Sequence, residues 1–186
     1  MRMTKCFLTL FIVLAVGGMQ LMNVRPAAAA SAAEIERSVN SAVKKLAGKN
    51  PWTKDLADKA KGVLIFPNVV KGGFMVGGQY GEGALRKHSK TVAYYNTVSA
   101  SYGLQAGLQK YGYALFFMTD SALDYLNRSD GWELGTGPSV VIVDKGMAGG
   151  ISTTTASSDV YAFFFDQQGL MAGLGLQGTK ITKIKK

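Results

Sequence analysis

The chain has 186 residues, of which 47% are hydrophobic and 18% are charged, and 21 Lys and Arg against 12 Asp and Glu give a formal net charge of +9. This balance is typical of a globular protein and excludes a disordered chain, a collagen and a coiled coil. One His and one Cys exclude a multi-histidine metal site, a four-cysteine zinc site and a disulfide framework.

The N-terminus carries the three parts of a secretory signal peptide. A short basic start precedes an apolar run over residues 7–16, and small residues follow at 27–30. This order predicts a signal peptide, with cleavage after Ala30 or Ala33. The apolar run is too short for a comfortable membrane span, and an uncleaved N-terminal anchor is the alternative.

We therefore expect a signal peptide over residues 1–30 and a single domain over residues 31–186. Cys6 lies in the expected leader, so the remaining chain can fold in an oxidising compartment without thiol chemistry. A chain of this length buries roughly 70% of its unfolded surface, which is enough for one sizeable core. Export predicts a periplasmic location, with the outer membrane as an associated surface.

Two amphipathic helices are expected to open the domain. An apolar stripe with a 3.6-residue period predicts a helix over residues 33–49, formed by Ile35, Val39, Ala42, Val43 and Leu46. Its acidic residues come first and its lysines last, as the helix dipole favours. Asn50-Pro51 ends this helix, and a shorter helix is expected over residues 53–61.

The chain after residue 61 is rich in Gly, Tyr, Val and Thr, and turn signals divide it into short segments. We expect strands near residues 63–66, 72–80, 83–88, 91–101, 103–109, 112–118, 139–143, 159–165 and 170–177. One short helix, capped by Asp120, is expected over residues 121–127. The predicted fold class is α+β: two N-terminal helices packed on a mostly antiparallel, strongly curved or barrel-like β-sheet, with one further short helix.

Glycines recur at intervals of four residues in this region: Gly73, Gly77 and Gly81, then Gly103 and Gly107, then Gly169 and Gly173. In a strand, residues at even spacing lie on one face, so each group forms a stripe without side chains. Such a stripe lets another element approach closely or lets the sheet bend sharply. The same spacing in helices would suggest a membrane dimerisation face, but no apolar stretch of about 18 residues supports that interpretation.

Motifs of catalysis and cofactor binding are weak. Residues 173–178 match G-x-G-x-x-G, but only eight residues remain for the helix that must hold the pyrophosphate. His88 lies in a basic turn, and no G-x-S-x-G nucleophile motif accompanies it. A hydrolase that uses His88 is therefore a much weaker hypothesis than a binding domain without enzymatic activity. Paired carboxylates are better explained as a helix cap, a surface pair and loop acids: Asp120 with Asp124, and Asp130 with Glu133. We predict no catalytic residue, no metal site, no cofactor and no enzymatic activity.

Two basic clusters are the candidate lipid-binding residues. The first helix carries Arg37, Lys44, Lys45 and Lys49, and the C-terminus carries Lys180, Lys183, Lys185 and Lys186. Basic amphipathic elements attract anionic lipid headgroups, and each nearby Lys or Arg contributes about 1 kcal/mol. The alternative is that these residues only keep the protein in solution. Nucleic acid is not expected as a partner, because export removes the chain from the cytoplasm.

An ordered series of segments resembles the SYLF domain. It begins with V-L-I-F-P-N-V-V-K-G-G-F at residues 63–74 and continues through residues 76–83, 101–109, 131–133, 159–163, 169–173 and 178–180. The resemblance covers nearly all of the chain from residue 34. It implies a module that binds phosphoinositides and other anionic lipids, found in eukaryotic actin-patch regulators and in exported bacterial proteins. It also implies a role for the N-terminal amphipathic helix, here residues 35–49.

The combined expectation is a non-enzymatic, exported lipid-binding domain that acts at a membrane surface of a bacterial envelope. The expected partner is an anionic phospholipid, lipid A phosphates or another envelope component, and an envelope protein is a further candidate; actin is not expected in a periplasm. The apolar stripe of the first helix has two competing uses, packing on the sheet or inserting into a membrane. The alternative function is a structural or partner-binding envelope protein, associated with the outer membrane, without a specific lipid ligand.

Overall fold

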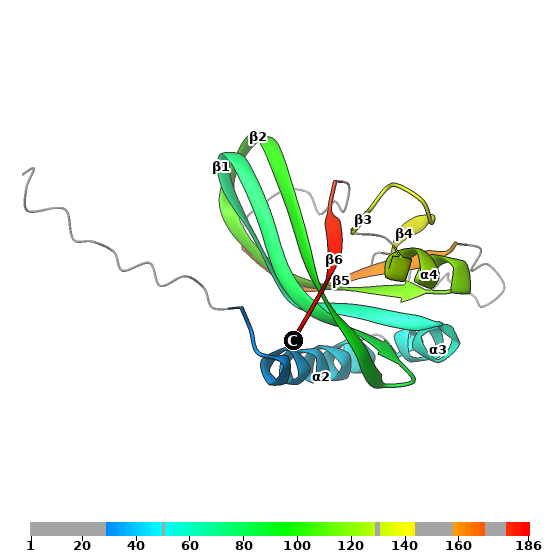
Figure 1. The fold of residues 1–186 in the computed structure, drawn as a ribbon. Coiled ribbons are helices and arrows are strands. Elements are labelled where there is room, and N and C mark those ends of the chain that lie inside the picture. Colours follow the sequence, from blue (N-terminus) through cyan, green and yellow to red (C-terminus); the bar gives the residue numbers. More distant parts are fainter. Residues whose placement is uncertain (1–28, 50, 129–130, 144–157, 170–177) are drawn as a thin grey trace, which may run out of the picture.

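The computed structural model describes residues 29–49, 51–128, 131–143, 158–169 and 178–186. In this part of the chain, three helices and the strands of a six-stranded sheet form an α+β fold, which confirms the predicted class. Two helices cover one face of the strongly curved sheet, and the third lies over the other face (Figure 1).

The two N-terminal helices are α2, Ala32–Lys49, and α3, Trp52–Lys59. They differ from the predicted ranges by one or two residues, so both predictions are confirmed. The apolar stripe of α2 is buried against the sheet at Ile35, Val39, Ala42 and Leu46, whereas Val43 at its margin is 36% exposed. The stripe is therefore used for packing on the sheet.

Two very long strands form the centre of the sheet. Strand β1, Gly62–Lys87, pairs antiparallel with β2, Lys90–Phe117, from one end to the other. The connecting turn is His88-Ser89, and both residues have left-handed backbone angles, with φ values of 47° and 66°. Six separately predicted strands are thus parts of one hairpin, interrupted by bulges and bends rather than by loops.

The glycine stripe allows β1 to bend back on itself. A Cβ added at Gly81 would lie 2.9 Å from the carbonyl oxygen of Asn68, and one at Gly83 would lie against the carbonyl group of Ile65. The two halves of the strand therefore approach each other where no side chain intervenes. This confirms the predicted close approach for the first group of glycines; Gly173 and the rest of the expected strand 170–177 lie outside the described residues.

The remaining elements complete the sheet and cover its concave side. They are α4 Asp120–Arg128, β3 Trp132–Glu133, β4 Val140–Val143, β5 Val160–Gly169 and β6 Lys180–Ile184. Described strands follow the order β3-β6-β2-β5-β4, with β1 paired to β2. β4 pairs with β5 in parallel, whereas the other described pairings are antiparallel.

Two apolar clusters lie on opposite faces of the sheet. One joins α4 to buried residues such as Tyr113, Phe117 and Trp132, and the other joins α2 and α3 to residues such as Phe116 and Phe163. Alternate residues of β2 point to opposite clusters, as the period of a strand requires. The sheet therefore holds α2 and α4 apart on its two sides.

Two local predictions are wrong. Asp120 does not cap α4: the Thr119 hydroxyl accepts a hydrogen bond from the Ala122 amide at 3.2 Å, and Asp120 is the first helical residue. The predicted strands end at residue 177 and omit one strand, because Lys180–Ile184 forms β6 between β2 and β3. Alternating Lys, Ile and Thr places Ile181 in the core, and this alternation was the available signal.

Candidate functional site

The outward face of α2 presents part of the first basic cluster. Arg37 and Lys44 are exposed, whereas the Lys45 ammonium lies 2.8 Å from the Asp166 carboxylate of β5. Lys45 and Asp166 are both partly exposed, and such pairs contribute about 0–1 kcal/mol, so Lys45 stays accessible to another anion. The side chain of Lys49 lies outside the described residues.

The same helix is tied to the hairpin by a polar contact. The Arg86 guanidinium donates hydrogen bonds to Glu36 at 3.0 Å and to Asn40 at 2.9 Å, and its side chain is only 12% exposed. The Tyr94 hydroxyl donates to the other oxygen of Glu36 at 3.0 Å. Together with the buried stripe, these contacts oppose any release of α2 from the sheet.

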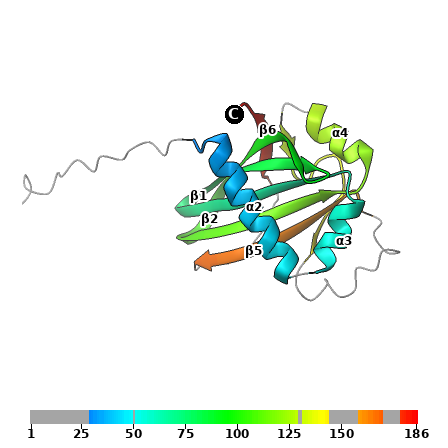
Figure 2. The same ribbon diagram turned by 90° about the horizontal axis from the view of Figure 1, so that it is seen from below.

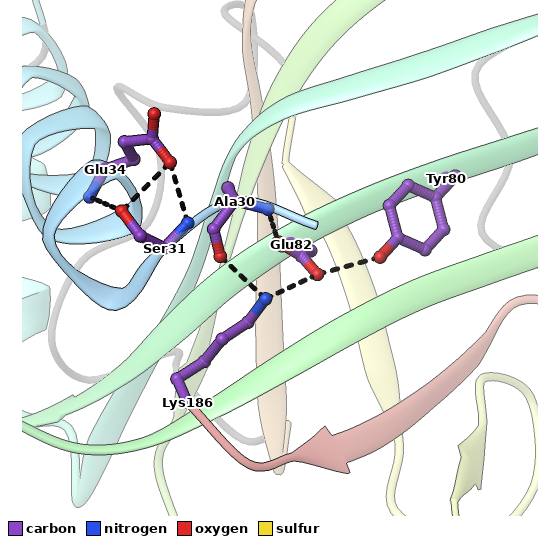
Figure 3. A network of polar contacts seen from close by, with 6 residues as sticks. All are labelled: Ala30, Ser31, Glu34, Tyr80, Glu82 and Lys186. Carbon is purple, nitrogen blue, oxygen red and sulfur yellow. Dashed lines mark hydrogen bonds and ion pairs between the residues drawn. The ribbon is translucent and has the colours of Figure 1, made fainter. Parts of the chain in front are cut away.

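The second basic cluster is divided by the structure. Lys180, Lys183 and Lys185 are exposed on or just after β6. Lys186 differs, because its side chain is 10% exposed and its ammonium lies 2.9 Å from Glu82 and 2.7 Å from the Ala30 carbonyl oxygen (Figure 3). The charge of Lys186 is therefore paired with a carboxylate of the protein.

The structure brings the C-terminus next to the first turn of α2 (Figures 1 and 2). Hydrogen bonds from the backbone and hydroxyl of Ser31 hold the pKa of Glu34 below its usual value, and the charges of Arg37 and Lys186 lower it further. One member of each basic cluster, Arg37 and Lys186, thus lies near the Glu34 carboxylate at this end. Lys44 lies seven residues beyond Arg37, about 10 Å along the helix.

An apolar cavity of about 290 Å³ opens between α2, α3 and the end of the hairpin. Apolar side chains form much of its wall: Val43, Leu46, Val63, Ile65 and Phe116. Polar residues at the cavity include Lys54, Arg86 and His88. The sequence does not reveal this cavity, because residues of three separate elements form its wall.

The described residues contain no group of three or more His, Cys, Asp or Glu that could hold a metal ion. Asp120, one of the paired carboxylates, lies 3.1 Å from the Lys61 ammonium. His88 is exposed in its turn, as expected for a solvated histidine. Among the helices of the described segments, none combines the length and apolar character needed to cross a membrane.

The C-terminal half of the chain matches a known protein family. Residues 98–186 fit the model of the Ysc84 family, which carries the description "Las17-binding protein actin regulator". A comparison with curated proteins found no match. The family match agrees with the resemblance to the SYLF domain, although residues 63–83 lie outside it. The pairing of β1 with β2 joins this unmatched segment to the matched one in a single sheet.

Proposed function

The chain belongs to the Ysc84 (SYLF) family through residues 98–186, and from this premise we propose that it is an exported, non-enzymatic domain that binds anionic lipid at a membrane surface of the bacterial envelope. The family supports a domain that binds lipid or regulates actin. Actin regulation is not part of the proposal, because an exported bacterial domain does not meet actin. The periplasm is the proposed compartment.

One observation carries the mechanism: α2 buries its apolar stripe in the sheet and leaves Arg37 and Lys44 on its outward face. Binding then depends on charge, without insertion of the helix. At about 1 kcal/mol for each Lys or Arg near an anionic surface, these two residues contribute about 2 kcal/mol. That energy corresponds to roughly a 25-fold difference in binding constant.

Co-sedimentation with vesicles tests this proposal. Protein produced from the full chain is mixed with phosphatidylglycerol-containing vesicles or with purely zwitterionic vesicles, at low and high salt. We expect binding to the anionic vesicles alone, and loss of binding as the Debye length falls from ~10 Å at 0.1 M salt to ~3 Å at 1 M salt.

A pair of matched variants separates local from total charge. Arg37→Gln with Lys44→Gln removes two charges from α2 and should weaken binding about 25-fold. Lys61→Gln with Arg128→Gln removes one charge that pairs with α4 and one in the last turn of α4, which packs on the face of the sheet opposite α2, and should weaken binding by only a few-fold. Equal loss in both variants would contradict a role of α2.

The same experiment distinguishes lipid binding from the alternative function. No binding to either vesicle would reject the lipid proposal and favour a partner-binding or structural protein of the envelope. Binding that is equally strong to zwitterionic vesicles and insensitive to salt would reject the charge mechanism. Such binding would direct attention to the apolar cavity, where a lipid chain could contact Val43 and Phe116.

A further inference from the structure

Ala30, just before α2, is held on both sides of its backbone. The Ala30 amide donates a hydrogen bond to Glu82 Oε2 at 3.0 Å, and the Ala30 carbonyl oxygen accepts one from Lys186 Nζ at 2.7 Å. Lys186 also pairs with Glu82 Oε1 at 2.9 Å. The two side chains of one ion pair therefore bind the amide and the carbonyl oxygen of Ala30 (Figure 3).

The two side chains that hold Ala30 are nearly buried. The side chains of Glu82 and Lys186 are 8% and 10% exposed. The Tyr80 hydroxyl donates a third hydrogen bond to Glu82, at 2.8 Å, and burial, followed by the Glu82 carboxylate, raises the pKa of Tyr80 to about 12. The hydroxyl therefore remains protonated at neutral pH and continues to donate. A carboxylate with this low exposure requires such donors, because desolvation penalises its charge.

The next residues form a capping box. The Ser31 amide and hydroxyl donate to Glu34 Oε2 at 2.7 and 2.9 Å, and the Glu34 amide donates to the Ser31 hydroxyl at 3.3 Å. This reciprocal arrangement satisfies free amides at the start of a helix. Residues 30–34 are thus positioned without a gap, whereas Ala29 is exposed.

Three possible cleavage points have different consequences for these contacts. Cleavage after Ala33 removes the capping serine, and cleavage after Ala30 removes the residue that Glu82 and Lys186 hold. Cleavage between Ala29 and Ala30 leaves both arrangements intact. It also places Ala27 and Ala29 at the positions three residues and one residue before the cut, where a signal peptidase requires small side chains.

We propose that a signal peptidase cuts the Ala29–Ala30 bond and that Glu82 binds the new α-ammonium group of Ala30. Water hydrolyses the C–N bond: its oxygen becomes part of the Ala29 carboxylate, and its two hydrogens end on the Ala30 nitrogen, which is an ammonium group at neutral pH. The nitrogen already lies 3.0 Å from Glu82 Oε2, so a backbone hydrogen bond becomes an ion pair without movement. Charge-assisted hydrogen bonds are roughly twice as strong as neutral ones.

This inference rests on the export proposed above, and N-terminal analysis tests it without lipid. The full chain, produced in a bacterium with a periplasm, should yield a protein that begins at Ala30 by intact mass and N-terminal sequencing. A start at Met1, Ser31 or Glu34 would overturn the proposal.

Two single substitutions in the leader provide matched controls. Ala29→Leu places a bulky residue directly before the cut and should abolish processing at Ala30. Ala28→Leu changes only the position between the two small residues and should permit it. The opposite result, with Ala28→Leu blocking the cut, would show that cleavage occurs after Ala30. Neither result depends on stability, because both residues are removed with the leader.

Amine reactivity tests the binding of the new N-terminus. In the processed protein, an acetylating reagent near neutral pH should modify the Ala30 amine at least roughly ten times more slowly than in Glu82→Gln, measured by peptide mass spectrometry. Glu34→Gln, which alters the neighbouring carboxylate, should leave the protection in place. Equal reactivity in the processed protein and in Glu82→Gln would overturn the binding step.

Failure of this proposal and failure of lipid binding are distinguishable. A protein that begins at Ala30 but binds no vesicles retains the inference and loses the lipid function. A protein that binds anionic vesicles but begins elsewhere retains the lipid function and loses the inference. If Glu82→Gln does not fold, Tyr80→Phe keeps the carboxylate and should retain the slow acetylation, whereas full reactivity in Tyr80→Phe would count against the site.

Discussion

Replacing Gly83 with alanine tests how the long strand β1 bends back on itself. A Cβ at this position would lie 2.9 Å from the carbonyl carbon of Ile65 and 2.7 Å from Cδ1 of Phe66. Real Cβ atoms essentially never approach other atoms this closely. Because Ile65 contributes backbone that is itself paired with Ala114 of β2, the contact cannot be relieved by rotating a side chain.

The expected cost follows from overpacking in a closely packed interior. Inserting a methyl group into such a site typically costs 1–3 kcal/mol, and a backbone neighbour places Gly83→Ala at about 3 kcal/mol. The loss of chain entropy in the unfolded state returns roughly 0.4–1 kcal/mol. The net destabilisation is about 2 kcal/mol, which lowers the melting temperature of a domain of this size by roughly 4–8 °C.

Thermal unfolding followed by circular dichroism, with urea midpoints as a second measure, would detect this change. Gly48→Ala is the matched control, because its added Cβ in the last turn of α2 meets no described atom within 4 Å apart from the adjacent backbone of its own helix. That variant should stabilise the protein by about 0.5–1 kcal/mol, since Ala is a better helix former than Gly. A Gly83→Ala protein as stable as the unmodified chain would refute the close approach of the two halves of β1.

Two further predictions concern α2 and the loop that precedes β5. Leu46→Ala should lower the free energy of unfolding by about 2–5 kcal/mol, because Leu46 is buried. Val43→Ala, at the exposed margin of the stripe, should lower it by less than about 1 kcal/mol. Equally small changes for both variants in urea unfolding would mean that the stripe does not pack on the sheet. Hydrogen bonds from the backbone and hydroxyl of Ser139 lower the pKa of Asp159 below its ordinary 3.8, so its stabilising effect is complete above that value and is lost as pH falls below it. Asp159→Asn should therefore melt at a lower temperature than the unmodified protein near neutral pH, and the difference should shrink in acid, while Asp124→Asn should match the unmodified protein throughout; a constant difference for Asp159→Asn would contradict the linkage.

Local patterns in the sequence predicted the helices well. The stripe from Ile35 to Leu46 repeats at the helical period, and this repeat alone locates α2 and identifies the side that packs. The four-residue glycine spacing correctly indicated close approach or bending. These features are readable because neighbours three, four or two residues apart already determine which side chains share a face.

Strand boundaries and the surroundings of individual lysines could not be predicted from such local patterns. Turn-like glycines inside β1 and β2 suggested separate strands. In the structure they lie in one continuous hairpin, whose pairing extends from Gly62 and Phe117 to Lys87 and Lys90. Pairing depends on residues of the opposite strand, which no short window contains. For the same reason, Lys183 and Lys186 look alike in sequence, although Lys183 is exposed and the Lys186 side chain is paired with Glu82.

The sequence by itself determined the helices, the α+β class, the family resemblance and the two clusters of positive charge. Only the tertiary structure decided that α2 packs on the sheet, that an apolar cavity opens beside it and that Lys186 meets Glu82 around Ala30. Helical periodicity is a local property of the chain. In the Ala30 site, Glu82 contacts Ala30, which is 52 positions away in the sequence, and Lys186, which is 104 positions away. Such contacts form only when the sheet curves and brings the two ends of the domain together.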